Sequence, residues 1–258
     1  MTAILSVRDL EKTFGSVVAA RDITLDVPAE QTVGIIGANG AGKTTFINMI
    51  TGHLRPTKGT IRFGEHDITG RPSREITRLG VSRSFQVAQV FPSLTVFDNV
   101  CAAAAIANSR VGTLGHALMR LRSPALIAQA EASLDLFRIT PYRDLRAATL
   151  PQGVRKLLDI AMAVVGSPRV ALLDEPTSGI SIQDKFGIME VVMSALRSRR
   201  LTVLFVEHDM EIVARYADRV LAFYDGTIIA DGPPAVALAD ARVQTLISGT
   251  RARGGAGA

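Results

Sequence analysis

The stretch GIIGANGAGKTTFINMITG (Gly34–Gly52) is the most informative part of the sequence for predicting the fold. It places a glycine-rich turn between an apolar run, QTVGIIG, and the helical pattern TTFINMITGHL. The turn fits the pattern G-x-x-x-x-G-K-[ST] at Gly37, Gly42, Lys43 and Thr44. Its glycines let successive backbone N–H groups face one phosphate, and the start of the helix adds the positive end of its dipole. The pattern therefore predicts a phosphate-binding loop, or P-loop, between a buried strand and a helix.

The residue types of this loop point to a nucleotide. Lys43 is placed to reach the β- and γ-phosphates, and Thr44 is placed to bind Mg²⁺. The other nucleotide-binding candidates in the loop are Asn39, Gly40, Ala41 and Thr45. The plain alternative is a glycine-rich turn with an exposed lysine, and the strand and helix patterns on its two sides argue against it.

Length and composition limit the class of protein. With 258 residues, 47% of them hydrophobic, the chain can form one large domain or two small ones. Its one cysteine, Cys101, excludes an internal disulfide and a site of several cysteines, and the N-terminus lacks the apolar core of a signal peptide. No apolar run reaches the roughly 20 residues of a membrane-spanning helix. We therefore expect a reducing, cytosolic location and no membrane crossing by this chain alone.

The basic net charge raises the question of a nucleic acid or an anionic lipid as partner. The net charge is +5, but the 29 basic residues are scattered, and only Arg197–Arg200 form a cluster. That cluster ends a helical pattern, where cations suit the helix dipole, so a solvated helix end is the favoured interpretation. We expect no nucleic-acid partner.

Strand and helix patterns alternate along the chain and predict an α/β fold. We expect a P-loop NTPase core with a mainly parallel sheet, together with an antiparallel β subdomain built from the first strands and a hairpin at 58–70. A helical, alanine-rich subdomain at roughly 95–165 is inserted in this core. Residues 1–258 are expected to form a single domain that ends in a tail at 233–258. The elements expected after the insertion are a strand at 170–175, a helix at 183–199, a strand at 201–208, a helix at 210–216 and two strands at 219–225 and 227–232.

A second motif, VALLDEP (Val170–Pro176), delivers two carboxylates at the end of a buried strand. Ligands of open α/β sheets gather at the carboxyl ends of the strands. Asp174 is then placed to hold Mg²⁺, and Glu175 to orient an attacking water or accept its proton. Two solvated acids at a strand end would be the better interpretation if the P-loop were missing, but the two motifs support each other.

Two further polar residues follow strand patterns. His208 ends the run LTVLFVEH and precedes Asp209, which is expected to cap the next helix. Gln86 follows the run VSRSF. A partly exposed histidine and an ordinary loop glutamine remain open as alternatives when each residue is taken alone.

The order of these motifs resembles the nucleotide-binding subunit of an ATP-binding cassette (ABC) transporter over nearly the whole chain. Within that family, VEHDM (206–210), GVSRSFQ (80–86) and the tail ADGPPAVALADARVQTLISG are similar to the LivG-type subunit of branched-chain amino acid importers. The resemblance implies that Phe14 stacks on adenine, that Gln86 senses Mg²⁺ and faces the membrane partner, and that His208 contacts the γ-phosphate. By pattern alone, Phe14 also fits a core residue at a strand end.

The chain departs from this family in two places. The family's Leu-Ser-Gly-Gly-Gln signature, which acts on the ATP of the opposite subunit, is replaced by LPQGV, the residues Leu150, Pro151, Gln152, Gly153 and Val154. Proline removes a hydroxyl and an N–H donor, while the N–H groups of Gly153 and Val154 still open a helix toward a phosphate. The loop after LLDEP, which usually ends in aspartate, ends in Ser181. We expect a working variant signature, with a degenerate signature as the alternative. Because a homodimer would have no complete signature, we favour a heterodimer, with a homodimer as the alternative.

The resemblance further implies a cofactor set, partners and a location. ATP and Mg²⁺ are the expected cofactors, Lys43, Glu175 and His208 the catalytic residues, and Thr44, Gln86 and Asp174 the metal ligands. The implied partners are integral-membrane permease subunits, a second ABC ATPase subunit and, indirectly, a periplasmic or extracellular substrate-binding protein. The implied location is the cytoplasmic side of the inner membrane.

Three other functions compete with branched-chain amino acid import as interpretations of this sequence. An importer of a related amide or of urea would look much the same in this subunit. A non-transport cassette acting on nucleic acid or ribosomes usually has a second cassette or a long coiled coil, and neither pattern occurs in this sequence. A small-molecule kinase is disfavoured because Glu175 beside Asp174 suits the activation of water.

Overall fold

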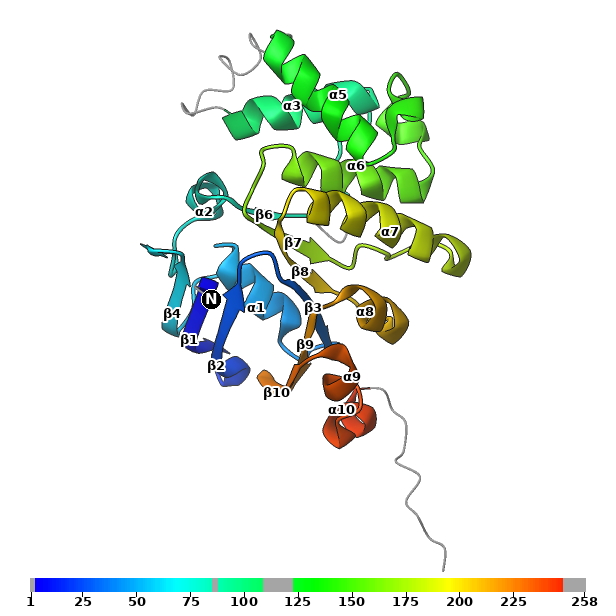
Figure 1. Ribbon diagram of the computed structural model, residues 1–258. Coiled ribbons are helices and arrows are strands. Elements are labelled where there is room, and N and C mark those ends of the chain that lie inside the picture. The colour runs from blue at the N-terminus through cyan, green and yellow to red at the C-terminus, as the bar shows by residue number, and fades with distance from the viewer. Residues whose placement is uncertain (1–2, 85–87, 109–122, 248–258) are drawn as a thin grey trace, which may run out of the picture. The chain divides into compact units, whose positions relative to one another are not determined.

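The computed structural model describes residues 3–84, 88–108 and 123–247. The chain divides into two compact units, one formed by Met1–Ile76 with Thr202–Ala258 and the other by Thr77–Leu201. Figure 1 traces the helices and strands of both units. No helix of the described ranges is long and apolar enough to cross a membrane.

The first unit contains the expected antiparallel β subdomain, a sheet in the order β2–β1–β4–β5 (Figure 1). Its strands are β1 (Ala3–Phe14), β2 (Val17–Pro28), β4 (Lys58–Phe63) and β5 (His66–Asp67). Residues 15 and 16 join β1 to β2 so tightly that Phe14 lies opposite Val17. The turn is possible because Gly15 takes a positive φ of 58°, a value that side chains disfavour.

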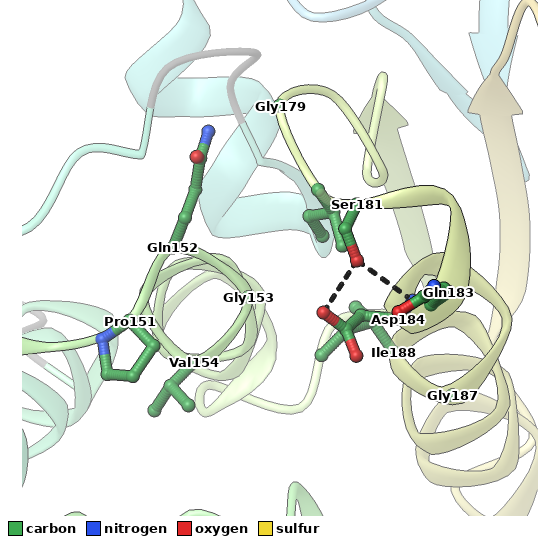
Figure 2. Close-up of a pocket in the computed structure, with 11 residues that line it drawn as sticks. Pro151, Gln152, Gly153, Val154, Gly179, Ser181, Gln183, Asp184, Gly187 and Ile188 are labelled. Atoms are coloured by element: carbon green, nitrogen blue, oxygen red, sulfur yellow. Dashed lines mark hydrogen bonds between the residues drawn. The ribbon is translucent and has the colours of Figure 1, made fainter.

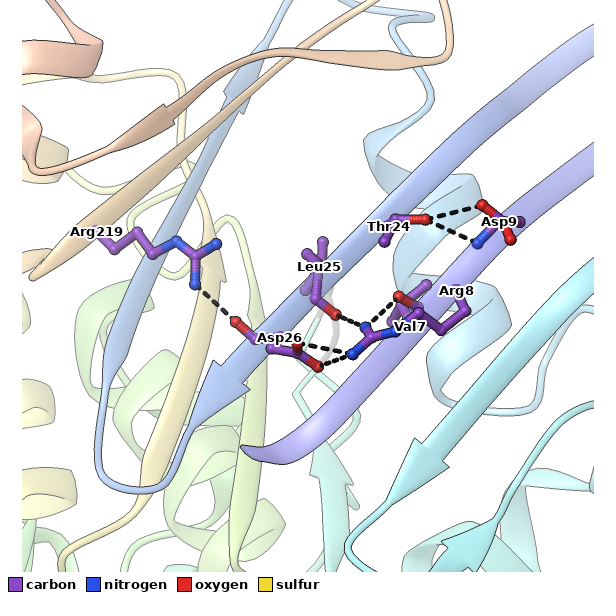
Figure 3. Close-up of polar contacts among 7 residues, drawn as sticks. All are labelled: Val7, Arg8, Asp9, Thr24, Leu25, Asp26 and Arg219. Carbon is purple, nitrogen blue, oxygen red and sulfur yellow. Dashed lines mark hydrogen bonds and ion pairs between the residues drawn. The ribbon is translucent and has the colours of Figure 1, made fainter. Parts of the chain in front are cut away.

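A polar network ties the surface of this sheet to β9 (Arg219–Tyr224), as Figure 3 shows. Arg8 Nη2 donates to both carboxylate oxygens of Asp26, at 2.8 and 2.7 Å, and Arg219 donates to the Asp26 backbone oxygen at 2.7 Å. Hydrogen bonds from Ser6 and Arg8 lower the pKa of Asp26. Arg8 and Asp26 are 46% and 48% exposed, so solvent screening leaves this ion pair a small contribution to stability.

The first unit also contains four strands in the order β10–β9–β3–β8. The strands other than β9 are β3 (Thr32–Gly37), β8 (Thr202–Val206) and β10 (Thr227–Gly232). β3 runs parallel to both β8 and β9, while β10 runs antiparallel to β9. Every residue of β3 and β8 is buried, as the apolar runs predict for strands covered on both faces.

Helices α1 (Lys43–Ile50) and α8 (Met210–Tyr216) pack on these strands. Phe46 of α1 meets Phe223 of β9 with ring centroids 5.3 Å apart. Gly34 lets α8 approach β3, because a Cβ atom there would lie 2.9 Å from Val213 Cγ1. The Asp209 carboxylate accepts hydrogen bonds from the first turn of α8, which confirms its predicted capping role.

Three short helices were not predicted from the sequence. They are α2 (Ser73–Leu79), α9 (Pro234–Ala237) and α10 (Ala241–Leu246). The described part of the expected tail therefore has structure of its own, and Asp240 caps α10 by accepting from Arg242 N at 2.8 Å.

The described residues of the second unit combine a parallel strand pair with several helices. The strands are β6 (Val81–Arg83) and β7 (Val170–Asp174). The helices are α3 (Val96–Asn108), α5 (Pro124–Leu136), α6 (Gln152–Val164) and α7 (Ile182–Ser198), with 3₁₀ turns η1 (Thr140–Tyr142) and η2 (Ala147–Thr149). α3 packs on α5 and α6, and α6 packs on α7 and on both strands. The described residues of the expected helical stretch at roughly 95–165 form α3, α5 and α6 with two 3₁₀ turns. β6 ends at Arg83, and Phe85, the last residue of the run VSRSF, lies outside the described residues.

Candidate functional site

The loop that follows β3 closes around its own lysine. Ala41 N donates to Ala38 O at 3.1 Å, which turns the chain back on itself. Lys43, the first residue of α1, donates from Nζ to the backbone oxygens of Gly37 and Ala38 at 2.6 and 2.9 Å. The ammonium group is therefore held against the inside of the loop at the start of the helix.

Two glycines of the loop are required by close backbone contacts. Gly42 has a φ of 98°, and a Cβ atom there would lie 2.6 Å from Ala19 O. Gly37 has a φ of 152°, and a Cβ atom there would lie 2.4 Å from Phe223 O. Gly40, with a φ of 80°, faces open space among the described residues. Close backbone contacts therefore exclude a side chain at Gly37 and Gly42, whereas Gly40 lies on the open side of the loop.

The open side of this loop fits the phosphates of ATP. Ala38, Asn39 and Gly40 are exposed, as is Thr44 at the start of α1, while Thr45 is half-buried. Within the described chain, no side chain caps α1 and no acidic residue lies in its first turn. Its first N–H groups and its dipole are therefore available to an anion, as the sequence predicts for a phosphate site.

Phe14, the predicted adenine contact, lies at the end of β1 in the same unit as the P-loop. Its side chain is 51% exposed, so it is not the core residue that its pattern also allowed. Lys12 Nζ lies 5.0 Å from the centre of its ring. The strand β2, which pairs with β1, brings Ala19 O against Gly42 of the loop. An exposed aromatic ring on a hairpin that touches the P-loop has the placement that base stacking needs.

His208 follows β8 at the same sheet edge as the P-loop. β8 and β3 run parallel with Val206 opposite Ile35, and Glu207 N donates to Ile35 O at 3.2 Å. The His208 side chain is exposed, and its backbone N donates to Glu207 Oε2 at 3.3 Å. Parallel strands present their carboxyl ends at one edge, so His208 and the P-loop share the edge at which ligands gather.

The second unit presents the acidic pair at the carboxyl end of β7. Asp174 is the last residue of the strand and is buried, whereas Glu175 is half-buried and has a positive φ of 47°. Glu175 O accepts a hydrogen bond from Ser178 N at 3.0 Å, which closes a turn directly after it. Left-handed backbone at a residue other than glycine is strained, and such strain concentrates at functional sites.

Asp174 also carries an ion pair that the sequence analysis did not identify. Arg83 Nη2 donates to Asp174 Oδ2 at 2.7 Å, and among the described residues no hydrogen bond reaches Oδ1. One carboxylate oxygen therefore remains to bind a cation, which fits the predicted Mg²⁺ ligand. The motif GVSRSFQ contains Arg83, and the signal that could have found it is a charged residue within a short strand that is otherwise buried.

Two more buried charges of the second unit were missed, and both lie on α6. Lys156 Nζ lies 3.5 Å from Asp174 O, and Asp159 Oδ1 accepts from Gln89 N at 2.8 Å. Both side chains are almost fully buried. The pattern of α6 offered a signal, because Lys156 and Asp159 interrupt the apolar face of an amphipathic helix.

The LPQGV segment opens α6 and lines a pocket in the second unit, shown in Figure 2. The pocket has a volume of about 550 Å³ and lies between the starts of α6 and α7. Pro151 is the residue before the helix and Leu150 is buried. The other residues of the segment, Gln152, Gly153 and Val154, all line the pocket.

Ser181, the second departure from the family, is the capping residue of α7. Its hydroxyl accepts from Asp184 N at 3.2 Å and donates to Asp184 Oδ2 at 2.7 Å, as Figure 2 shows. A serine at this position therefore satisfies the start of α7 through its side chain. It lies in the same pocket as Gln152 and Gly153.

Gln86, the predicted Mg²⁺ sensor, lies outside the described residues. Within the described ranges, no group of three or more histidine, cysteine, aspartate or glutamate side chains could hold a metal ion. The predicted metal ligands are of another kind, since Mg²⁺ bound with a nucleotide commonly takes one or two protein ligands and completes its shell with phosphate and water.

The profile of the ABC transporter family matches residues 20–178, more than half of the chain. The chain belongs to the ABC transporter family. It is an ATP-binding cassette, the ATPase part of such transporters, as the order of its motifs predicts.

Curated relatives of this cassette extend the match beyond the residues of the profile. The high-affinity branched-chain amino acid transport ATP-binding protein LivG of Salmonella typhimurium is 32% identical over 238 residues, which cover 90% of this chain and 92% of that protein. LivG of Escherichia coli gives the same values. The corresponding protein BraF of Pseudomonas aeruginosa is 32% identical over 234 residues, with the same coverage.

Solved structures of ATP-binding cassettes share the fold. A cassette of an ABC transporter in its ADP conformation matches with a TM-score of 0.84 at 28% identity, over 96% of this chain and 100% of that one. A nucleotide-free cassette matches with a TM-score of 0.83 at 27% identity, over 95% and 98% of the two chains. The expected α/β fold with a P-loop core is therefore confirmed.

Proposed function

We propose that this chain hydrolyses ATP to power the import of branched-chain amino acids, or of a related small amide or amino acid, through separate permease subunits. The observation that carries the proposal is the P-loop, where Lys43 and the open start of α1 face a loop held by Gly37 and Gly42. The names of the relatives, which match 90% of the chain, support branched-chain amino acids as the cargo.

The proposed reaction is an in-line attack of water on the γ-phosphate. Lys43 and His208 stabilise the charge that develops on the phosphoryl oxygens, and Glu175 positions the water. The turn that fixes the backbone of Glu175 supports this role, because a positioned carboxylate orients water better than a mobile one. Phe14 stacks on the adenine ring, and the N–H groups of the loop hold the phosphates.

Mg²⁺ is the proposed second cofactor, with Thr44, Asp174 and Gln86 as its protein contacts. When bound, it neutralises charge on the β- and γ-phosphates. The exposed hydroxyl-bearing residue Thr44 and the available Oδ1 of Asp174 support this assignment. We further propose that both compact units act together as one ATPase domain spanning residues 1–258.

The proposed assembly is a head-to-tail dimer of cassettes on the cytoplasmic side of the inner membrane, bound to two permease subunits. The LPQGV segment then serves the ATP held by the second cassette, and a heterodimer places a complete signature on this chain's own P-loop. A periplasmic or extracellular binding protein delivers the cargo to the permeases. The LPQGV segment and Ser181 line the same pocket, which supports a common role for them at the dimer interface.

The test is reconstitution with the permeases and the second cassette, which we expect the neighbouring genes to encode. We expect ATP-dependent uptake of labelled leucine, isoleucine or valine into vesicles. Uptake of urea or a short amide alone would revise the cargo while leaving the ATPase assignment in place. Phosphate release that depends on RNA or DNA, with no uptake of any of these solutes, would contradict the proposal.

A further inference from the structure

The ion pair between Arg83 and Asp174 is buried. The two side chains are 9% and 11% exposed, and Nη2 lies 2.7 Å from Oδ2. By contrast, the pair of Arg8 and Asp26, with the same shortest distance of 2.7 Å, is 46% and 48% exposed (Figure 3). A guanidinium group with so little exposure interacts strongly with its partner, because little water screens the charges.

The strand register explains how the two groups meet. β6 and β7 are parallel, Arg83 is aligned with Leu172, and Ser84 N donates to Leu172 O at 2.9 Å. Residues two apart on a strand point to the same face, so Asp174 lies on the same face of β7 as Leu172. Arg83 therefore reaches diagonally along β7 to the carboxylate at its end.

The surroundings of the carboxylate contain a second positive charge. Lys156 of α6 is 4% exposed, and its Nζ lies 3.5 Å from Asp174 O. Asp174 offers Oδ1 to a cation while Oδ2 is held by Arg83. A metal ion at Oδ1 thus approaches a carboxylate whose charge is already largely compensated.

We propose that Arg83 is a positioning residue that holds the Asp174 carboxylate in place and sets the Mg²⁺ concentration needed for nucleotide binding. The inference rests on the proposed function, since it takes Asp174 as a ligand of the metal that accompanies ATP. Arg83 acts through Asp174 and touches neither nucleotide nor substrate. It fixes the direction of the carboxylate and weakens its attraction for a divalent cation.

The charge of Arg83 determines the direction of the expected effect. Arg83→Met keeps a long, unbranched side chain but removes one of the two nearby cations, so the negative charge of Asp174 acts more strongly on the metal. The Mg²⁺ concentration for half-maximal binding of ATPγS should fall about threefold or more, because like charges a few ångströms apart repel strongly where water is scarce. Binding of ATPγS in EDTA should stay as in the wild type, because Asp174 then has no metal to hold.

The experiment measures equilibrium binding of radiolabelled ATPγS to the purified full-length chain over a series of Mg²⁺ concentrations and in EDTA. Arg8→Met is the matched control, because it removes an arginine of the same kind from an ion pair that solvent already screens. Its Mg²⁺ midpoint should equal that of the wild type. Arg83→Lys keeps the positive charge without the planar fork, so its midpoint should fall by a smaller factor than in Arg83→Met.

Two results would overturn the inference while leaving the proposed function intact. One is an unchanged or higher Mg²⁺ midpoint in Arg83→Met, and the other is a loss of ATPγS affinity by the same factor in EDTA and in Mg²⁺. If Arg83→Met does not fold, Arg83→Lys decides, and a midpoint at or above the wild-type value overturns the inference. A wild-type chain that binds no ATPγS at any Mg²⁺ concentration would overturn the proposed function as well.

Discussion

Helices α1 and α6 both have a glycine at their start, Gly42 directly before α1 and Gly153 in the first turn of α6, but the two glycines are there for different reasons. At α1, the backbone of Gly42 takes a φ of 98° and lies so close to Ala19 O that a Cβ atom would be 2.6 Å away. At α6, Gly153 is within the helix, and a Cβ atom there would lie 3.1 Å from Ile188 Cδ1, the end of a flexible side chain. The first glycine is required by the backbone of a loop, whereas the second lies against the end of a side chain that can move.

This difference shows where a sequence motif specifies geometry by itself. The P-loop glycines are fixed by backbone conformations that only glycine adopts without strain, so the pattern alone identifies the loop. The signature segment depends on what α7 and the loop before it place opposite it, namely Ile188, Ser181 and Gly179. Substitutions in the two loops should therefore differ in the size and kind of their effects.

The largest expected effect is that of Lys43→Ala on nucleotide binding. The ammonium group lies inside the loop at 2.6 Å from Gly37 O, where phosphate oxygens are expected. Its loss should lower ATP affinity by about 3 kcal/mol, or roughly a hundredfold, as charge-assisted contacts to phosphate are strong. Equilibrium binding of ATP to the purified chain measures this effect.

Lys58→Ala is the matched control for this prediction. Lys58 is 70% exposed and pairs with Glu11 on the surface of the antiparallel sheet, at 3.0 Å. Its removal should leave ATP affinity unchanged. Equal affinities of Lys43→Ala and Lys58→Ala would show that the loop is not the nucleotide site.

The next effect concerns stability and compares three glycines directly. Gly42→Ala should lower the free energy of unfolding by about 2 kcal/mol or more, because its φ and the contact with Ala19 O both oppose a side chain. Gly153→Ala should change it by less than about 1 kcal/mol, because helix propensity offsets a contact that Ile188 can relieve. Gly187→Ala, in open space on α7, should raise it by about 0.5–1 kcal/mol.

Urea unfolding of the three variants measures these differences. The order of stability should be Gly187→Ala, then Gly153→Ala, then Gly42→Ala. A Gly153→Ala variant as unstable as Gly42→Ala would mean that the signature helix is as tightly constrained as the P-loop, and the distinction between the two loops would fail.

The smallest expected effect is that of Pro151→Ser. Pro151 has φ −54° and ψ 150°, which serine also adopts, and serine supplies both a capping hydroxyl and the N–H that proline lacks. Stability should change by less than about 1 kcal/mol, since better capping offsets the greater freedom of the unfolded chain. ATPase activity of the assembled transporter should rise a few-fold, as one added donor implies. Unchanged ATPase activity would show that the missing donor does not limit the signature.

Much of the fold was predictable because its signals are local. The buried strands β3, β7 and β8 and the helix α8 follow from apolar runs and a capping aspartate close to them in sequence. The short helix α2 was missed, although Pro72 and Glu75 at its start are suitable signals: Glu75 N donates to Pro72 O at 2.9 Å. In a helix of seven residues, about two turns, these signals compete with those of an ordinary loop.

The site was predictable in its motifs but not in its supporting contacts. The P-loop residues and the acidic pair were identified from patterns of fewer than ten residues each. The contact between Arg83 and Asp174 joins residues 91 apart in sequence, and only the pairing of β6 with β7 brings them together. The approach of Gly153 to Ile188 likewise depends on how α6 packs against α7. Contacts of this kind depend on strand register and helix packing, which a single sequence does not specify.

We propose that this chain's own P-loop and acidic pair perform the hydrolysis, while its LPQGV segment serves the ATP of its partner. The most direct measurement replaces the glutamate of one cassette at a time by glutamine in the assembled transporter and records phosphate release and uptake. Glu175→Gln in this chain should keep ATP binding and lower turnover about a hundredfold or more, because the amide keeps the shape of the side chain but cannot accept a proton. The same change in the second cassette should cost less. Equal losses from the two subunits, or full activity of a homodimer of this chain, would contradict the claim.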